Sequence, residues 1–62
     1  MDKYLISVRE ASKYFGIGIN KFYELLRSQP DMPVVKIGEH HKINVPLFKK
    51  WLDTCAEEGR TL

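Results

Sequence analysis

Apolar and small residues recur at helical spacing early in the chain and predict a helix from Val8 to Phe15. They share one helical face at Val8, Ala11, Ser12 and Phe15. Ser7 and Glu10 have the spacing of a capping box, in which each side chain binds a backbone N–H of the other residue. Gly16 suits a left-handed helix end. The pattern therefore predicts a short helix whose two ends are both marked by sequence.

A second hydrophobic stripe predicts a helix that begins near Gly18 or Ile19 and ends at about Ser28. Its inward positions are Phe22, Leu25 and Leu26. Two prolines within residues 29–33 exclude a regular helix there and predict a loop. Two short helices joined by a glycine turn are typical of a helix-turn-helix, which presents its second helix to DNA.

Two short β-prone runs, 34–37 and 41–45, flank Gly38-Glu39-His40 and predict a β-hairpin with glycine in its turn. A third helix is predicted next, because Pro46 is tolerated in a first helical turn, where its missing N–H has no intrahelical partner. The buried face of this helix is predicted at Phe48, Trp51, Leu52 and Cys55. Residues 57–62 are expected to form a frayed tail.

The order helix, helix, hairpin, helix predicts an α+β fold, a small winged helix-turn-helix whose wing is the hairpin. A chain of 62 residues accommodates one such domain, expected to span residues 1–62 with its core at about 4–56. The longest apolar runs are too short to cross a membrane, and the start of the chain lacks the features of a leader segment. We therefore expect an intracellular protein.

Charge is unevenly distributed along the chain. The formal net charge is +2, which alone says little about a partner. Residues 1–52 contain nine Lys and Arg against five Asp and Glu, whereas the last ten residues contain Arg60 against Asp53, Glu57 and Glu58. A basic body with an acidic tail suits a nucleic-acid-binding first part and a solvated end.

The polar face of the second predicted helix carries the candidate base-reading residues. A helix fits the major groove, and the residues near its N-terminus usually contact the base edges. The candidates are Ile19, Asn20, Lys21, Tyr23, Glu24 and Arg27. Asn20 can pair with adenine, Lys21 can contact guanine or phosphate, and Glu24 can accept a hydrogen bond from cytosine. The alternative is a solvated helix face, because any surface helix carries such side chains.

The predicted hairpin offers a second set of candidate contacts. A wing beside the duplex would bring basic side chains to phosphates or to the minor groove, from Lys36, His40, His41 and Lys42. Glu39 opposes this use, and the alternative is an ordinary charged β-turn. The position of the hairpin next to a candidate recognition helix favours the wing.

Catalysis and metal binding have little support in the sequence. A zinc site needs about four clustered ligands, and only His40, His41 and Cys55 are at hand. Cys55 belongs to the apolar face of the third predicted helix, which favours a buried structural cysteine over a nucleophile. The sequence contains no phosphate-binding loop or dinucleotide fingerprint. We expect a protein that is not an enzyme and uses no cofactor.

Three segments of the chain resemble the excisionase-type helix-turn-helix domains. Residues 5–17, LISVREASKYFGI, are similar to the opening of these domains, and residues 32–38, MPVVKIG, to the strand that leads into their wing. Residues 42–43 with 48–52 resemble their closing strand and helix. The segment 10–15 is especially similar to excisionases of conjugative transposons. Together the segments extend over nearly the whole chain.

This resemblance implies a winged-helix fold related to the MerR-type DNA-binding domain. It implies a recombination directionality factor that binds double-stranded DNA in the arms of an integrated element, often as several cooperative copies, and bends it. The bend would help a tyrosine-family integrase to assemble the excisive complex in the bacterial cytoplasm, associated with the nucleoid. The chain departs from the family pattern in two places: at Gly18, where many relatives have a capping Ser or Thr, and at residues 39–41, where many have arginines.

Two other functions stay open at this point. A small transcriptional repressor or activator would have the same fold, because a fold does not determine its role. A protein-interaction adaptor would instead bind a partner through the exposed face of the third helix, at Lys49, Lys50 and Asp53. Promoter sites or DNA-independent partner binding would distinguish these functions from excision.

Overall fold

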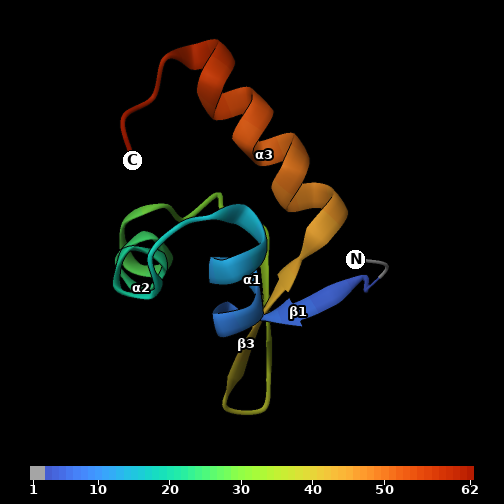
Figure 1. The fold of residues 1–62 in the computed structure, drawn as a ribbon. Helices are drawn as coiled ribbons and strands as arrows, with labels where there is room; N and C mark the ends of the chain where they lie inside the picture. The colour runs from blue at the N-terminus through green and yellow to red at the C-terminus, as the bar shows by residue number, and fades with distance from the viewer. Residues whose placement is uncertain (1–2) are drawn as a thin grey trace.

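The chain forms three helices and three short strands in the computed structural model, which describes residues 3–62. The elements follow one another as β1 (Leu5–Ser7), α1 (Val8–Phe15), α2 (Ile19–Ser28), β2 (Val34–Ile37), β3 (His40–Asn44) and α3 (Val45–Glu58) (Figure 1). The fold is a small α+β domain, as predicted. Residues 1–2 of the expected 1–62 domain lie outside the described residues.

Both predicted ends of α1 are confirmed. The Ser7 hydroxyl accepts from the Glu10 N–H at 3.1 Å, and the Glu10 carboxylate accepts from the Ser7 N–H at 3.2 Å, which completes the capping box. Gly16 closes the helix with φ of +69°, a conformation that side chains with a Cβ rarely adopt. The next helix, α2, begins after Gly18 without a side-chain cap. Its start therefore depends on packing rather than on a local hydrogen bond.

Three antiparallel strands form the sheet in the order β1-β3-β2. The strand β1 was not predicted, because three residues are too few to show an alternating pattern. It forms through long-range pairing with β3, in which Ile6 lies opposite Ile43 and Ser7 opposite Lys42. On the other side of β3, Val34 also lies opposite Ile43. The central strand is therefore the last one in the chain.

The hairpin and the start of α3 differ by one residue from the sequence pattern. The turn is Gly38-Glu39 alone, because His40 already pairs with Ile37 and belongs to β3. Gly38 has φ of +61° at the first turn position, where two-residue hairpins often require glycine. Val45 begins α3 instead of ending a strand, because the side chain of Asn44 accepts from the Leu47 N–H at 3.1 Å and caps the helix.

Aromatic and aliphatic side chains from all layers meet in one core. The largest fully buried side chains are Phe22, Phe48, Ile6, Leu25 and Ile43. The rings of Phe22 and Phe48 stack with centroids 5.4 Å apart, and Phe48 also contacts Trp51 at 5.5 Å. Burying each such side chain stabilises a fold by about 1.5–3 kcal/mol. The core therefore fixes α2 and α3 against the sheet.

The C-terminal segment differs from the expected frayed tail over 57–62. Helix α3 extends to Glu58, and Gly59 reverses the chain so that the Arg60 N–H donates to the Cys55 carbonyl at 2.9 Å. The Arg60 guanidinium then lies 3.0 Å from the Asp31 carboxylate, and Leu62 packs against the core. These contacts connect the end of the chain to the loop after α2. They are long-range, which explains why the local pattern did not indicate them.

Trp51 and Arg60 surround the carboxylate of Asp31. The guanidinium carbon of Arg60 lies 5.8 Å from the centre of the Trp51 ring. The buried indole N–H of Trp51 has no hydrogen bond of ordinary geometry within residues 3–62, but it lies beside Asp31. This N–H and the Arg60 guanidinium lower the pKa of the Asp31 carboxyl from its ordinary value of 3.8. The three side chains thus hold the loop and α3 together.

None of the helices in the described part of the chain has the length and apolar character needed to cross a membrane.

Candidate nucleic-acid interface

Helix α2 and the β2–β3 hairpin border the same two hollows. One hollow is lined by Leu26 of α2 and Gln29 just after it, together with Val34, Lys36 and His41 of the hairpin. The other is lined by Tyr23 of α2 and by residues of β3. The structure therefore brings together the two segments that sequence reasoning selected separately.

Four of the predicted base-reading residues have exposed side chains on α2, namely Asn20, Tyr23, Glu24 and Arg27. Lys21 is half-buried, and its ammonium lies 3.4 Å from the Glu24 carboxylate. Surface pairs of this kind stabilise a protein by at most about 1 kcal/mol, so a phosphate can replace the carboxylate. Ile19 is half-buried and packs against the core. Less of its side chain is therefore accessible to DNA than the sequence suggested.

The four predicted hairpin residues fall into two pairs. Lys36 lies directly opposite His41 in the β2–β3 register. His41 is two residues from the buried Ile43, so Lys36 and His41 are on the same side of the sheet as Ile43. His40 and Lys42 alternate to the other side, opposite Ile37 and Val35, which are 51% and 42% exposed. Sequence reasoning grouped these four side chains as one set of contacts, whereas the pleat of β2 and β3 directs them to two faces.

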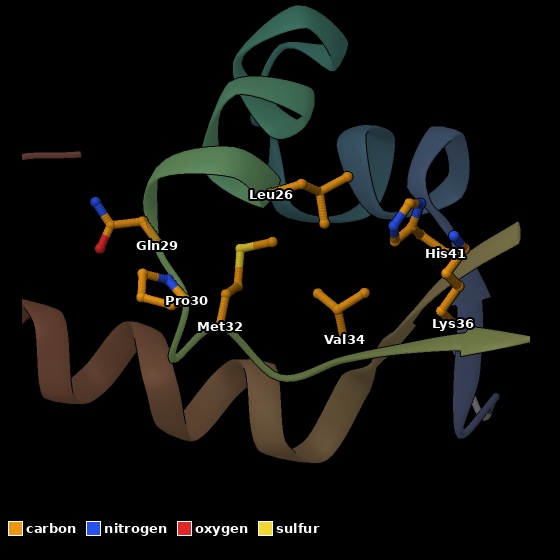
Figure 2. A pocket seen from close by; sticks show the side chains of 7 residues that line it. All are labelled: Leu26, Gln29, Pro30, Met32, Val34, Lys36 and His41. Atoms are coloured by element: carbon orange, nitrogen blue, oxygen red, sulfur yellow. The ribbon is translucent and has the colours of Figure 1, made fainter.

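Figure 2 shows the hollow between the end of α2 and the hairpin, with a volume of about 200 Å³. Its apolar lining includes Leu26, the buried Met32 and Val34. Lys36 and His41 lie together at one end of it (Figure 2). This arrangement gives α2 a basic neighbour on the hairpin, at the side where the sheet faces the helix.

The second hollow brings in Arg9 of α1, to which the sequence analysis gave no role. It has a volume of about 250 Å³ and is lined by Ser7, Val8, Arg9, Tyr23, Glu39, His40, His41 and Lys42. The sequence signal was present, because Arg9 belongs to the polar face of α1. It could not be used without knowing that the start of α1 lies beside β3.

Several cations near the two hollows have no carboxylate partner. Among the described residues, the ion pairs involve Lys3, Lys21 and Arg60 only. Arg9, Lys36 and Lys42, which line the hollows, take part in none of them. Arg27, which is exposed on α2 and lines neither hollow, takes part in none of them either. Glu10, the acidic neighbour of Arg9 in sequence, is bound to the Ser7 N–H and to Lys3, which lower the pKa of its carboxyl. This surface is therefore electrostatically suited to an anion.

Metal ligands do not gather anywhere in residues 3–62: no group of three or more His, Cys, Asp or Glu side chains could hold an ion there. Cys55 is buried in the core, which confirms its prediction as an internal side chain.

Comparison of the chain with protein-family models, with curated proteins and with solved structures gives no match.

Proposed function

We propose that this protein is a winged helix-turn-helix that binds double-stranded DNA, with α2 as the recognition helix and the β2–β3 hairpin as the wing. The observation that carries the proposal is that α2 and the hairpin line two hollows together, with the unpaired Lys36 in one and the unpaired Arg9 and Lys42 in the other. A helix of the size of α2 fits the major groove, and a hairpin beside it reaches the adjoining backbone or minor groove. Helix α1 then leads into α2 through the turn at Gly16, as in a helix-turn-helix.

The division of labour within this surface follows from side-chain chemistry. The exposed Asn20 and Arg27 can form paired hydrogen bonds to base edges, to adenine and to guanine respectively. Lys36, like Lys21 after exchange of its Glu24 partner, is suited to phosphate. Phosphate contacts supply affinity and register, while base contacts supply sequence preference.

We further propose that the protein is an excisionase. The three segments that resemble excisionases follow one another in the fold: residues 5–17 form β1, α1 and the turn after it, residues 32–38 contain β2, and residues 42–43 with 48–52 belong to β3 and α3. The role is architectural: the protein bends the arms of an integrated element and assists a tyrosine-family integrase. Bending a site by tens of degrees costs on the order of 1–6 kcal/mol, which several bound copies can offset.

A binding experiment with two classes of duplex tests the proposal. The full chain is titrated against duplexes from the ends of its host element and against promoter duplexes, at low and at moderate salt. We expect salt-sensitive binding, because phosphate contacts release counterions, and preference for the element ends. Deletion of the gene should then abolish excision in the presence of integrase without changing transcription. Preference for promoters together with altered transcription would make the protein a regulator instead.

Absence of duplex binding at low salt would overturn the DNA-binding proposal as a whole. A pull-down with integrase from nuclease-treated extract is the companion measurement. Integrase binding that survives nuclease treatment, in a chain that binds no duplex, would identify an adaptor. The exposed Lys49, Lys50 and Asp53 of α3 are then the residues to substitute.

A further inference from the structure

We propose that the hollow where α1, α2 and β3 meet holds a backbone phosphate of the bound duplex, with Arg9 as its main ligand. This junction hollow is the one lined by Arg9, Tyr23 and Lys42 among others. The inference rests on the proposed DNA-binding function and adds a contact from the first helix. It extends the interface beyond the recognition helix and the wing.

The junction hollow exists because of where β1 ends. Ser7 is the last residue of β1 and pairs with Lys42, so β3 continues past it without a strand on that side. The chain turns there into α1, which places Arg9 at the open edge of β3. Tyr23 of α2 completes the lining from the third element. Because the hollow lies at this open edge, residues from both faces of β3 border it, His41 from one face and Lys42 from the other.

The charge balance of the junction hollow favours a single anionic group. Arg9 and Lys42 are cationic, and neither is ion-paired within residues 3–62. Glu39 is the one carboxylate that lines the hollow. Glu10 does not line it, because the capping box and Lys3 hold its carboxylate. The cationic side chains therefore outnumber the acidic one even when both histidines are neutral.

The hydrogen-bond donors of the junction hollow match the oxygens of a phosphate. A guanidinium presents a planar set of N–H donors that can bind two phosphate oxygens at once. The Tyr23 hydroxyl can donate to a third oxygen, and its side chain is 46% exposed and so can be reached from outside. Lys42 adds a charge without a fixed direction.

The position of the junction hollow selects the duplex backbone over a small anion. At about 250 Å³ it lies below the usual size of a ligand pocket, about 300–1,000 Å³. It lies between α2 and the hairpin, the two elements proposed to contact adjoining grooves, and the backbone of one strand separates those grooves. The first helix of a helix-turn-helix also crosses the backbone. A phosphate on that strand is therefore the occupant that the surroundings specify.

The test compares Arg9→Ala with Lys50→Ala, a matched loss of one exposed cation on α3, which extends away from the hairpin turn (Figure 1). For Arg9→Ala we expect affinity to fall by about tenfold on specific and unrelated duplexes alike, as one charge-assisted contact is lost. The slope of log affinity against log salt should decrease by about 1. Lys50→Ala should leave both quantities unchanged. Arg9→Lys should restore the slope and only part of the affinity, because an ammonium keeps the charge but lacks the fork.

Neutral methylphosphonates placed one at a time along the duplex locate the phosphate. One position should weaken binding of the parent chain and have no further effect on Arg9→Ala, because the two changes remove the same contact. If no methylphosphonate position couples to Arg9, or if Arg9→Ala keeps the salt slope of the parent chain, the proposed phosphate contact in the junction hollow is wrong, while DNA binding by α2 remains possible. If the parent chain binds no duplex, the proposed function itself fails.

A titration of the free protein with inorganic phosphate separates the two sources of the group. We expect no saturable amide shifts at Arg9 and Lys42 at millimolar phosphate, because the duplex supplies the other contacts that bring its phosphate to the hollow. Saturation by phosphate alone, together with an unchanged duplex affinity in Arg9→Ala, would assign the hollow to a small anion and overturn the proposal.

Discussion

The two ends of the molecule use cationic side chains in different ways. At the α3 end, Arg60 lies 3.0 Å from the carboxylate of Asp31 and 2.7 Å from that of Glu58. At the hairpin end, Arg9 and Lys42 line a hollow and have no such partner within the described part of the chain. An internal partner makes a cation part of the fold, whereas an unpaired cation is available to an outside anion. Substitutions should therefore change stability at one end and binding at the other.

The largest expected effect lies at the α3 end, in Trp51→Ala. Trp51 packs against Phe48 and beneath Arg60, and truncation of such a core aromatic costs about 3–5 kcal/mol. A domain of this size has little stability to spare, so we expect it to unfold. Circular dichroism and urea titration measure the loss. Leu47→Ala on the exposed side of the same helix is the control, and it should change the free energy of unfolding by no more than about 0.5 kcal/mol.

A native-like melt of Trp51→Ala would show that the α3 end does not depend on its core aromatic. The proposed difference between the two ends would then not extend to stability, because the contacts of Arg60 and Trp51 would contribute little to the free energy of unfolding.

On the proposed recognition helix α2, Arg27→Ala should weaken DNA binding by about 1–3 kcal/mol, the range for a lost arginine contact to a base. Arg27 is exposed on α2 and has no ion pair among the described residues, so the unfolding temperature should stay unchanged. Lys21→Ala should weaken binding less, because its ammonium is partly neutralised by Glu24. Gel-shift titration beside a thermal melt gives both quantities. Unchanged affinity in both variants would move the reading surface away from α2.

Ser7→Ala sharpens the comparison, because Ser7 lies at the hairpin end but acts on the fold. Its hydroxyl caps α1 at the Glu10 N–H, and loss of such a cap costs about 1 kcal/mol, within a range of about 0.5–2. We expect a lower urea midpoint with DNA affinity unchanged under conditions where the chain is folded. Ser28→Ala, at the last residue of α2, is the control and should leave the midpoint unchanged. A loss of affinity without a loss of stability would mean that Ser7 contacts the duplex directly.

Local signals allowed prediction of most elements of the fold. Ser7, Gly16 and Pro46 act on their own neighbours in sequence, and the helices begin or end where these residues indicated. The strand β1 and the contacts of Arg60 depend on partners far along the chain, at β3 and at Asp31. No local pattern carries that information.

The candidate site divides in the same way. The polar face of α2 could be read from helical periodicity, and its exposed residues include Asn20, Tyr23 and Arg27. The two faces of the hairpin and the role of Arg9 could not. They depend on the register of β3 against its neighbours and on the end of β1 at Ser7, which only the folded sheet determines.

The smallest expected effect is the acid sensitivity of the α3 end, seen in Asp31→Asn. The pKa of the Asp31 carboxyl is below its ordinary value of 3.8, because of the Trp51 N–H and the Arg60 guanidinium. A carboxyl whose folded-state pKa is lowered stabilises the fold above its unfolded-state pKa, and that contribution disappears as the pH falls through the folded-state pKa. The parent chain should thus melt at a constant temperature from neutral pH down to about pH 5 and lose stability below it. The first loss of stability should come from protonation of Glu10, because the ordinary pKa of its carboxyl, 4.5, is the higher of the two.

Asp31→Asn should melt slightly below the parent at neutral pH and approach it as the solution is acidified. The reason is that protonation of Asp31 removes the same ion pair that the substitution removes. Glu10→Gln is the matched variant at the hairpin end, and its curve should approach that of the parent at a higher pH, because the ordinary pKa of Glu10 is higher. If the melting temperatures of Asp31→Asn and the parent instead differ by the same amount at every pH down to strong acid, the Arg60–Asp31 pair contributes nothing to the stability of the fold. The proposed difference between paired and unpaired cations would then be wrong for the α3 end.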